Sequence, residues 1–328
     1  MLPIIENTQP RAYDRTAIFH YLDTLIGNTK LHRLNYDHGN LYTKLEFQNI
    51  FGSIKDRPAL YILRKAYERH LIDDDTTVIE STSGNFGIAL AGICRLLKIK
   101  FVPVIDPNIS GEKANILKLN GCEPVRVSER DETGGFLLNR RKVVKEYLEE
   151  HQNAFTPNQY ENPDNYMAYY YTLGNEICNV IHDLDYAFIS VSTGGTITGL
   201  SQRLKEHYKN IRIIAVDVQG SMIFSNKPAI RKLSGMGASL RTPLFDNAQI
   251  DDFVILSQAD IIKGCESLYS RHSLFLGASS GAAYAASDLV LKRLNKKNIN
   301  AIFISPDGGN SYIDTVYNSK WVTENIIT

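Results

Sequence analysis

The chain of 328 residues carries 36 Lys plus Arg and 36 Asp plus Glu, so its formal net charge is zero. Hydrophobic residues make up 43% and charged residues 22%, which is typical of a globular protein with material for two ordinary domains or one large one. Balanced charge argues against nucleic acid as a partner, and no apolar stretch is long enough to span a membrane. The start, MLPIIENTQP, lacks the basic segment and apolar run of a signal peptide, so we expect a cytoplasmic protein.

The cysteines lie far apart in the sequence and form no C-x-x-C pair, which is typical of reduced and mostly buried thiols. The eight histidines are equally scattered, so we expect no metal site. The cysteines are Cys94, Cys122, Cys178 and Cys265.

Short runs of β-branched residues alternate with amphipathic stretches along the chain. This alternation predicts an α/β protein whose parallel sheets are covered by helices on both faces, arranged as two units that flank a cleft. The predicted strands are 76–82, 100–106, 123–128, 186–192, 211–218, 252–257 and 300–307. The predicted helices are 56–70, 84–98, 111–120, 135–151, 195–209, 258–272 and 280–297.

The stretch NIFGSIKDRPA (49–59) places Lys55 in a turn of small residues directly before the first predicted helix. An ammonium at this point opposes the helix macrodipole, whose N-terminal end is positive. A lysine that points into water fits the same pattern, and that is the commoner role of a lone lysine. A lysine whose charged form is disfavoured instead offers a neutral amine, which can form a Schiff base with a carbonyl cofactor.

A second loop, ESTSGNFG (80–87), joins a strand that ends near Ser81 to the next helix. Thr82, Ser83 and Gly84 present hydroxyl and backbone N–H groups at the start of that helix, where a carboxylate or phosphate binds well. Serine and threonine also cap helices for purely structural reasons, so both interpretations stay open.

The alternation stops at residues 151–166, which are rich in Asn, Gln and Pro and indicate a crossover between domains. Beyond them, VSTGGTITG (191–199) again joins a strand to a helix, and its T-G-G-T core can surround a phosphate. No Lys-Ser/Thr follows and the spacing is not G-x-G-x-x-G, so neither a Walker A loop nor a dinucleotide loop is indicated. A tight structural turn explains the same residues.

The second interruption, residues 225–245, is a long loop rich in glycine and basic residues, which is typical of a lid or a binding loop. After it, GASSGAA (277–283) resembles the nucleophile elbow of serine hydrolases in composition only. The last histidine, His272, precedes Ser279 and Ser280, whereas the hydrolase order requires a later one. We therefore set the hydrolase interpretation aside.

Five motifs in this order, S-x-K-D-R, T-S-G-N, S-T-G-G-T, G-x-S-S-G and P-D-G-G, resemble the pyridoxal-phosphate β-family of fold type II. Its members include cysteine synthase and cystathionine β-synthase. The resemblance implies a tryptophan synthase β-like fold with two domains, each a mostly parallel twisted sheet flanked by helices. It implies a smaller mobile substrate-loop domain at 50–155 and a larger cofactor-phosphate-binding domain at 15–49 plus 156–328.

The resemblance also implies roles for single residues. Lys55 would carry pyridoxal 5'-phosphate, Asn85 would hydrogen-bond the 3'-oxygen of its ring, and Ser279 would face the pyridine nitrogen. A serine there does not enforce a protonated ring, which favours β-elimination over racemisation or transamination. The cofactor phosphate would be held by Ser192, Thr193, Gly194, Gly195 and Thr196. The substrate α-carboxylate would be bound by Thr82, Ser83, Gly84 and Gln159.

Departures from the cysteine synthase pattern bear on the substrate. Tyr160 stands where that enzyme has Phe, Ser192 where it has Gly, and Phe86 where it has Thr. Two additional hydroxyls suggest a polar second substrate rather than sulfide, so Tyr160 and Ser192 join Lys55 as candidate catalytic residues. Three arginines are candidates to pair with a leaving phosphate or with substrate carboxylates. They are Arg140, Arg231 and Arg241.

Further stretches, including IESTSGNFGIALA, ETGGFLLNRRK, NQYEN and IFSNKPAIRKLSGMGAS, resemble a branch of the family that makes a precursor of 2,3-diaminopropionate for siderophore biosynthesis. Arg140 lies in one of them and is favoured for that reason. The resemblance implies a homodimer in which the amine of L-glutamate replaces the phosphate of O-phospho-L-serine. Cysteine synthase, with sulfide as the nucleophile, is the main alternative. Alternatives of other classes are a non-catalytic amino-acid sensor on the same fold and a nucleotide-binding protein that uses 191–199.

Overall fold

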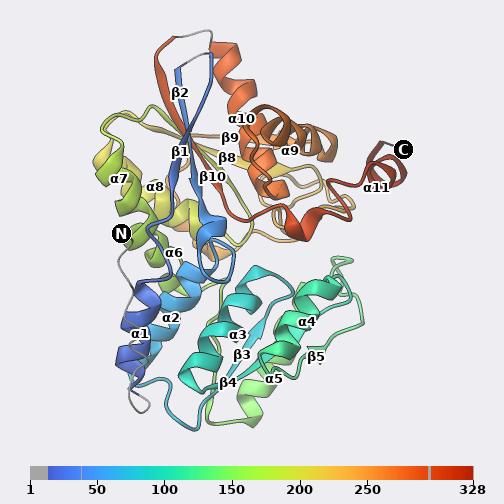
Figure 1. Ribbon diagram of the computed structural model, residues 1–328. Coiled ribbons are helices and arrows are strands. Elements are labelled where there is room, and N and C mark those ends of the chain that lie inside the picture. The colour runs from blue at the N-terminus through green and yellow to red at the C-terminus, as the bar shows by residue number, and fades with distance from the viewer. Residues whose placement is uncertain (1–13, 38, 295–296, 328) are drawn as a thin grey trace, which may run out of the picture.

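The computed structural model describes residues 14–37, 39–294 and 297–327, which form two α/β bodies that lie one above the other in Figure 1. The larger body contains a six-stranded sheet of order β1-β2-β10-β7-β8-β9. All neighbouring strands in it are parallel except β1 and β2. The strands are β1 (Leu31–Leu34), β2 (Gly39–Leu45), β7 (Tyr186–Ser190), β8 (Arg212–Val218), β9 (Asp252–Leu256) and β10 (Ile299–Ser305).

The smaller body contains a four-stranded parallel sheet of order β5-β4-β3-β6. Its strands are β3 (Thr77–Ser81), β4 (Lys100–Ile105), β5 (Val125–Arg126) and β6 (Ala154–Phe155). The helices around it are α1 (Arg15–Asp23), α2 (Asp56–Glu68), α3 (Asn85–Leu97), α4 (Gly111–Leu119) and α5 (Leu137–Glu150).

Helix α1 shares the apolar core of the smaller body. Ile18, Phe19 and Leu22 are buried in one cluster with residues of α2 and α3. The structure therefore groups α1 with the body that contains 50–155, although the family pattern assigned 15–49 to the larger domain. The domain boundaries themselves stay a prediction.

The sheet of the larger body is buried on both faces, as its near-continuous apolar strands require. On β8, Ile213 and Ala215 belong to one apolar cluster, whereas Ile214 and Val216 belong to the cluster on the other face. Helices of the larger body are α6 (Pro163–Tyr169), α7 (Asn175–Val180), α8 (Gly195–His207), α9 (Gln258–His272), α10 (Ala278–Leu294) and α11 (Ser319–Val322).

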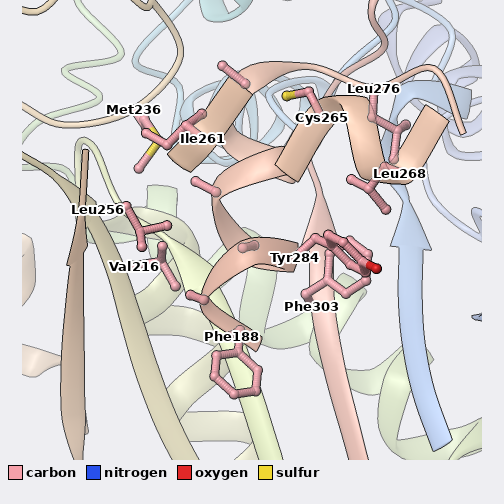
Figure 2. Packing of buried hydrophobic residues seen from close by; sticks show 14 of the residues in the cluster. Phe188, Val216, Met236, Leu256, Ile261, Cys265, Leu268, Leu276, Tyr284 and Phe303 are labelled. Carbon is pink, nitrogen blue, oxygen red and sulfur yellow. The ribbon is translucent and has the colours of Figure 1, made fainter. Parts of the chain in front are cut away.

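Figure 2 shows how α9 and α10 pack on the strands of the larger sheet. Tyr284 of α10 lies against Phe303 of β10, with ring centroids 5.8 Å apart. Met236, from the loop that follows β8, is buried in the same cluster. The core therefore fixes both the start of α10 and part of that loop.

All seven predicted strands and all seven predicted helices are present, and the predicted α/β fold class is confirmed. The predicted crossover at 151–166 is only partly irregular, because it contains β6 and the first turn of α6. The four cysteines are free and buried, as expected. Among the described residues, no helix is both long and apolar enough to cross a membrane.

Candidate active site

Segments that follow the carboxyl ends of strands from both sheets line one cavity of about 980 Å³. Parallel strands in α/β proteins present their ligand-binding loops at this end. Arg231 lines the cavity, whereas Arg241 and Gly195 are not among its lining residues. The predicted site residues that line it are Lys55, Thr82, Ser83, Gly84, Asn85, Arg140, Gln159, Tyr160, Ser192, Thr193, Gly194, Thr196 and Ser279.

Lys55 lies directly before α2, in a loop whose polar groups are internally satisfied. The Asp56 carboxyl accepts a hydrogen bond from Phe51 N at 2.7 Å, and Ser53 Oγ accepts one from Lys55 N at 3.1 Å. The Lys55 amine has no hydrogen-bond or ion-pair partner in the described part of the chain. Burial lowers the pKa of Lys55 to about 8, which makes its neutral form accessible. The geometry thus supports a nucleophilic amine rather than a lysine directed into water.

A buried charge network stands behind this loop. The Arg57 guanidinium donates to both oxygens of Glu46, at 2.6 and 2.9 Å, and to both oxygens of Glu176, at 2.6 and 2.9 Å. Lys44 Nζ donates to Glu176 Oε2 at 2.6 Å. Because Arg57 belongs to α2 and Lys44 to β2, the network fixes the lysine-bearing helix to the larger sheet.

The loop 191–194 joins β7 to α8, as the sequence predicts. Gly194 has a φ of 92°, which a residue with a side chain rarely adopts. Thr193 Oγ1 is buried and has no hydrogen-bond partner among the described residues. Ser192 Oγ donates to Gly237 O at 3.2 Å. An unsatisfied hydroxyl beside the free N–H groups that open a helix suits a phosphate.

Gly195 serves the packing of α8 against α6. A Cβ at this position would clash with the side-chain amide of Asn165. Asn165 Nδ2 in turn donates to Gln159 O, so the glycine links the phosphate loop to the segment before α6. The expected contact between Gly195 and the cofactor stays a prediction.

The loop 82–84 opens α3, as expected, and its hydroxyls already have partners. Thr82 Oγ1 accepts a hydrogen bond from Gly87 N at 3.0 Å, which caps the helix. Ser83 Oγ donates to Asp106 Oδ2 at 3.0 Å. Gly84 is the N-cap residue, and no atom lies within 4 Å of the position that a Cβ would occupy there.

Arg140 extends from α5 to this loop. Its Nη1 donates to Ser83 Oγ at 2.9 Å, and its Nε lies 3.3 Å from Asp106 Oδ2. The three side chains form a small polar cluster at the start of α3. Of the candidate arginines, Arg140 is therefore held beside the predicted carboxylate site.

Gln159 and Tyr160 hold the backbone that leads into the same loop. Gln159 Nε2 and Tyr160 Oη both donate to Ser81 O, at 3.1 and 3.0 Å. Both side chains are buried and line the cavity. The Tyr160 hydroxyl thus acts on the substrate loop through the Ser81 carbonyl.

Two further predicted residues form hydrogen bonds with residues of the larger body. Ser279 is buried in the first turn of α10, and its carbonyl accepts a hydrogen bond from Ser190 Oγ at 2.6 Å. Asn85 Nδ2 donates to Asp307 Oδ2 at 2.8 Å, and Tyr312 Oη donates to the same oxygen at 3.0 Å. Burial raises the pKa of Asp307.

Several cavity residues were not predicted from the sequence. Asp106 ends a predicted strand, and Asp307 lies within the P-D-G-G motif, so their positions at strand ends were a usable signal. Lys113 and Arg130 also line the cavity, and nothing local in the sequence separates them from surface charges.

Three features line one cavity: a lysine amine removed from water, a loop whose threonine hydroxyl has no partner within the described part of the chain, and a helix that begins after small polar residues. Together they define an enzyme that holds a carbonyl cofactor bearing a phosphate. Comparison with known proteins agrees. Residues 22–307 match the family model of pyridoxal-phosphate dependent enzymes, and the chain belongs to this family. Pyridoxal phosphate is accordingly its cofactor, and the nucleotide-binding and sensor alternatives are set aside.

The similar proteins are named as enzymes. N-(2-amino-2-carboxyethyl)-L-glutamate synthase of Ralstonia nicotianae is 38% identical over 302 residues, covering 90% of this chain and 89% of that protein. The O-acetylserine dependent cystathionine β-synthase of Helicobacter pylori has a TM-score of 0.84 at 31% identity, covering 90% of this chain and 98% of that one. A hydrogen sulfide-producing enzyme of Fusobacterium nucleatum has a TM-score of 0.83 at 30% identity, covering 89% and 98%.

Proposed function

We propose that this enzyme catalyses a β-replacement in which the amine of L-glutamate takes the place of the phosphate of O-phospho-L-serine. One Cβ–O bond breaks, one Cβ–N bond forms, and the proton taken from Cα is returned to it. The products are N-(2-amino-2-carboxyethyl)-L-glutamate, a precursor of 2,3-diaminopropionate for a siderophore-type pathway, and inorganic phosphate.

The charge of the cavity carries this proposal. Besides Lys55, which would hold the cofactor, five basic side chains of the described residues line it, against the two carboxyl groups of Asp106 and Asp307. The two proposed substrates bring three carboxylates and a phosphate, which need such an excess of positive charge, whereas sulfide does not. The basic residues are Lys55, Lys113, Arg130, Arg140, Arg231 and Lys232.

The residues present fit the cofactor. Lys55 would hold it covalently, the Thr193 hydroxyl and the first N–H groups of α8 would bind its phosphate, and Asn85 and Ser279 would contact its ring. When bound, pyridoxal phosphate withdraws electrons from the substrate Cα and so weakens the Cα–H and Cβ–O bonds. The neutral amine of Lys55 takes the Cα proton and later gives it back, for which a lowered pKa is suited.

Arg140 and Ser83 would bind the α-carboxylate of the serine derivative. Asp106 orients both side chains before the substrate arrives, and the start of α3 adds backbone N–H groups. Gln159 and Tyr160 keep this loop in place through Ser81 O. The name of the Ralstonia relative supports the choice of glutamate and of this product.

The specific alternative is cysteine synthase chemistry. Two structural relatives bear on it: an O-acetylserine dependent enzyme, which favours O-acetylserine as donor, and a hydrogen sulfide-producing enzyme, which connects this fold with sulfide chemistry. The test supplies the holoenzyme with O-phospho-L-serine or O-acetyl-L-serine, together with L-glutamate or sulfide, and identifies products by mass spectrometry. The glutamate adduct with release of phosphate is the expected result, and cysteine as the main product would reject the proposal.

We also propose that the enzyme is a homodimer and acts in the cytoplasm, both from the family resemblance. Sedimentation of the purified protein at micromolar concentration checks the first, and cell fractionation the second.

A further inference from the structure

Arg231 lies in the irregular loop between β8 and α9, and it differs from the other arginines of the cavity. Its Nη1 is buried and has no hydrogen-bond partner in the described residues, and its Nη2 donates only to Ser239 Oγ, at 3.3 Å. None of the ion pairs found in the described part of the chain involves Arg231. The side chain nevertheless lines the cavity.

A guanidinium without a counterion is costly in a desolvated place. Burial accordingly lowers the pKa of Arg231, and only the charge of Asp217 opposes this. Asp217 lies near the end of β8, fully buried, and forms no ion pair with Arg231 within the described residues. Arg231 Nη1 therefore has an opposite charge nearby but no contact partner among the described residues.

The other arginines already have partners or point elsewhere. Arg140 pairs with Asp106, and Arg130 is exposed, with its guanidinium over the ring of Phe136. The Arg241 guanidinium lies over the rings of Phe224 and Phe245, and Arg241 is not among the cavity-lining residues. Arg231 is thus the partly buried cavity arginine, among those described, that lacks a carboxylate.

The loop that carries Arg231 is fixed in place. Leu233 and Met236 are buried in the core of the larger body. Gly237 N donates to Val191 O at 2.8 Å, and Ser192 Oγ donates to Gly237 O. Gly237 has a φ of 70°, and a Cβ there would lie 2.6 Å from Arg231 Nη1. The glycine gives the guanidinium its place, directly beside the phosphate loop.

The two arginine sites come from different bodies. Arg140 stands on α5 of the smaller body, and Arg231 on the loop of the larger one. The bodies approach each other where Ser239 Oγ lies 3.4 Å from the position of a Cβ on Gly135. Two separate cationic sites suit two anionic substrates.

We propose that Arg231 binds a carboxylate of the amino acid that acts as nucleophile. This rests on the proposed function. Arg140 and Ser83 then receive the serine derivative, and Arg231 receives L-glutamate by its side-chain or its α-carboxylate. A paired, charge-assisted hydrogen bond of this kind changes affinity by about 10–100-fold.

The experiment measures steady-state kinetics of the holoenzyme with O-phospho-L-serine and L-glutamate for the wild type, Arg231→Gln and Arg231→Lys. The matched control is Lys227→Gln, which removes one positive charge from an exposed residue of the same loop that is not among the cavity-lining residues. We expect Arg231→Gln to raise KM for glutamate about 10–100-fold and KM for O-phospho-L-serine less than about two-fold. Arg231→Lys should show a smaller change in the same direction, and Lys227→Gln none beyond about two-fold.

Two glutamate analogues identify the carboxylate. L-glutamine lacks the side-chain carboxylate and L-isoglutamine lacks the α-carboxylate, and Arg231→Gln should lose the discrimination against one of them. An unchanged KM for glutamate in both Arg231 variants, or a raised KM for O-phospho-L-serine alone, would overturn the inference. If the wild type forms no glutamate adduct at all, the proposed function has failed instead. If Arg231→Gln does not fold, Arg231→Lys gives the same split between the two KM values.

Discussion

Replacing Arg57 by methionine should destabilise the protein strongly, because it would leave buried carboxylates without their main partner. In the wild type Arg57 binds Glu46 and Glu176, each through two hydrogen bonds. After the replacement, Lys44 alone remains, 2.6 Å from Glu176 and 4.0 Å from Glu46. One negative charge then stays buried and unpaired, which typically costs about 3–5 kcal/mol.

Arg64 offers a matched control on the same helix. It pairs with Asp23, and both side chains are partly exposed, so Arg64→Met should cost about 1 kcal/mol or less. Equilibrium unfolding of the apoenzyme in urea, at pH 7, compares the two variants with the wild type. A loss below about 1.5 kcal/mol for Arg57→Met, or an equal loss for Arg64→Met, would refute the reasoning.

The pH dependence of this loss tests its cause. Burial opposes ionisation of Glu176, but the hydrogen bonds and positive charges of Arg57 and Lys44 outweigh this effect and lower the pKa of Glu176 to about 2. In the wild type, the interaction of ionised Glu176 with Arg57 and Lys44 therefore stabilises the fold at pH values above about 4.3, the pKa of glutamate in the unfolded chain. This contribution is lost as the pH falls toward 2. Protonation below pH 4 removes the unpaired charge in Arg57→Met. The difference in free energy of unfolding between this variant and the wild type should therefore become smaller below pH 4.

Four further predictions concern the cavity. The holoenzyme should be yellow, and borohydride should fix the cofactor to Lys55; label on another lysine would contradict this. Cofactor uptake by the apoenzyme should rise as the pH passes through about 8, the pKa at which half of the Lys55 amine is neutral. Ser83→Ala should raise KM for O-phospho-L-serine with cofactor absorbance intact, because it removes the partner of Arg140; unchanged kinetics would move the carboxylate site elsewhere. Tyr160→Phe should lower glutamate-dependent turnover roughly ten-fold, measured by product assay, because it removes one of the two side-chain hydrogen bonds that hold Ser81 O. Ser192→Gly should raise KM for glutamate but keep the cofactor spectrum, since it frees the loop of Arg231; full activity of both hydroxyl variants would favour sulfide as the nucleophile.

The parts of the site that sequence predicted well depend on local signals. Lys55, the T-S-G-N loop and the S-T-G-G-T loop each lie between a predicted element and the next, and the structure places all three stretches on one cavity. Small residues at the start of a helix have few other uses in such number. Their order along the chain was also enough for the family resemblance.

The strands and helices that were not predicted from the sequence, such as β2 and α6, carry polar residues where apolar ones are expected. Strand β2 pairs with β10, yet it carries Thr43 and Lys44 in buried positions. Lys44 is tolerated there because Glu176 and Thr29 bind its ammonium, a contact that no local pattern reveals. The sequence pattern N-P-D-N, typical of a loop, is instead the start of α6, with Asn162 as N-cap and Pro163 in the first turn.

The two hydroxyls that distinguish this chain from cysteine synthases each donate a hydrogen bond to a backbone carbonyl. Sequence reasoning expected Tyr160 and Ser192 to meet a substrate directly. In the structure, Tyr160 holds the carbonyl of Ser81 and Ser192 holds the carbonyl of Gly237. Each carbonyl belongs to a segment that presents a polar group to the cavity, Ser83 in one case and Arg231 in the other. Both hydroxyls therefore hold loops that line the cavity, and a direct contact of either hydroxyl with a substrate stays a prediction.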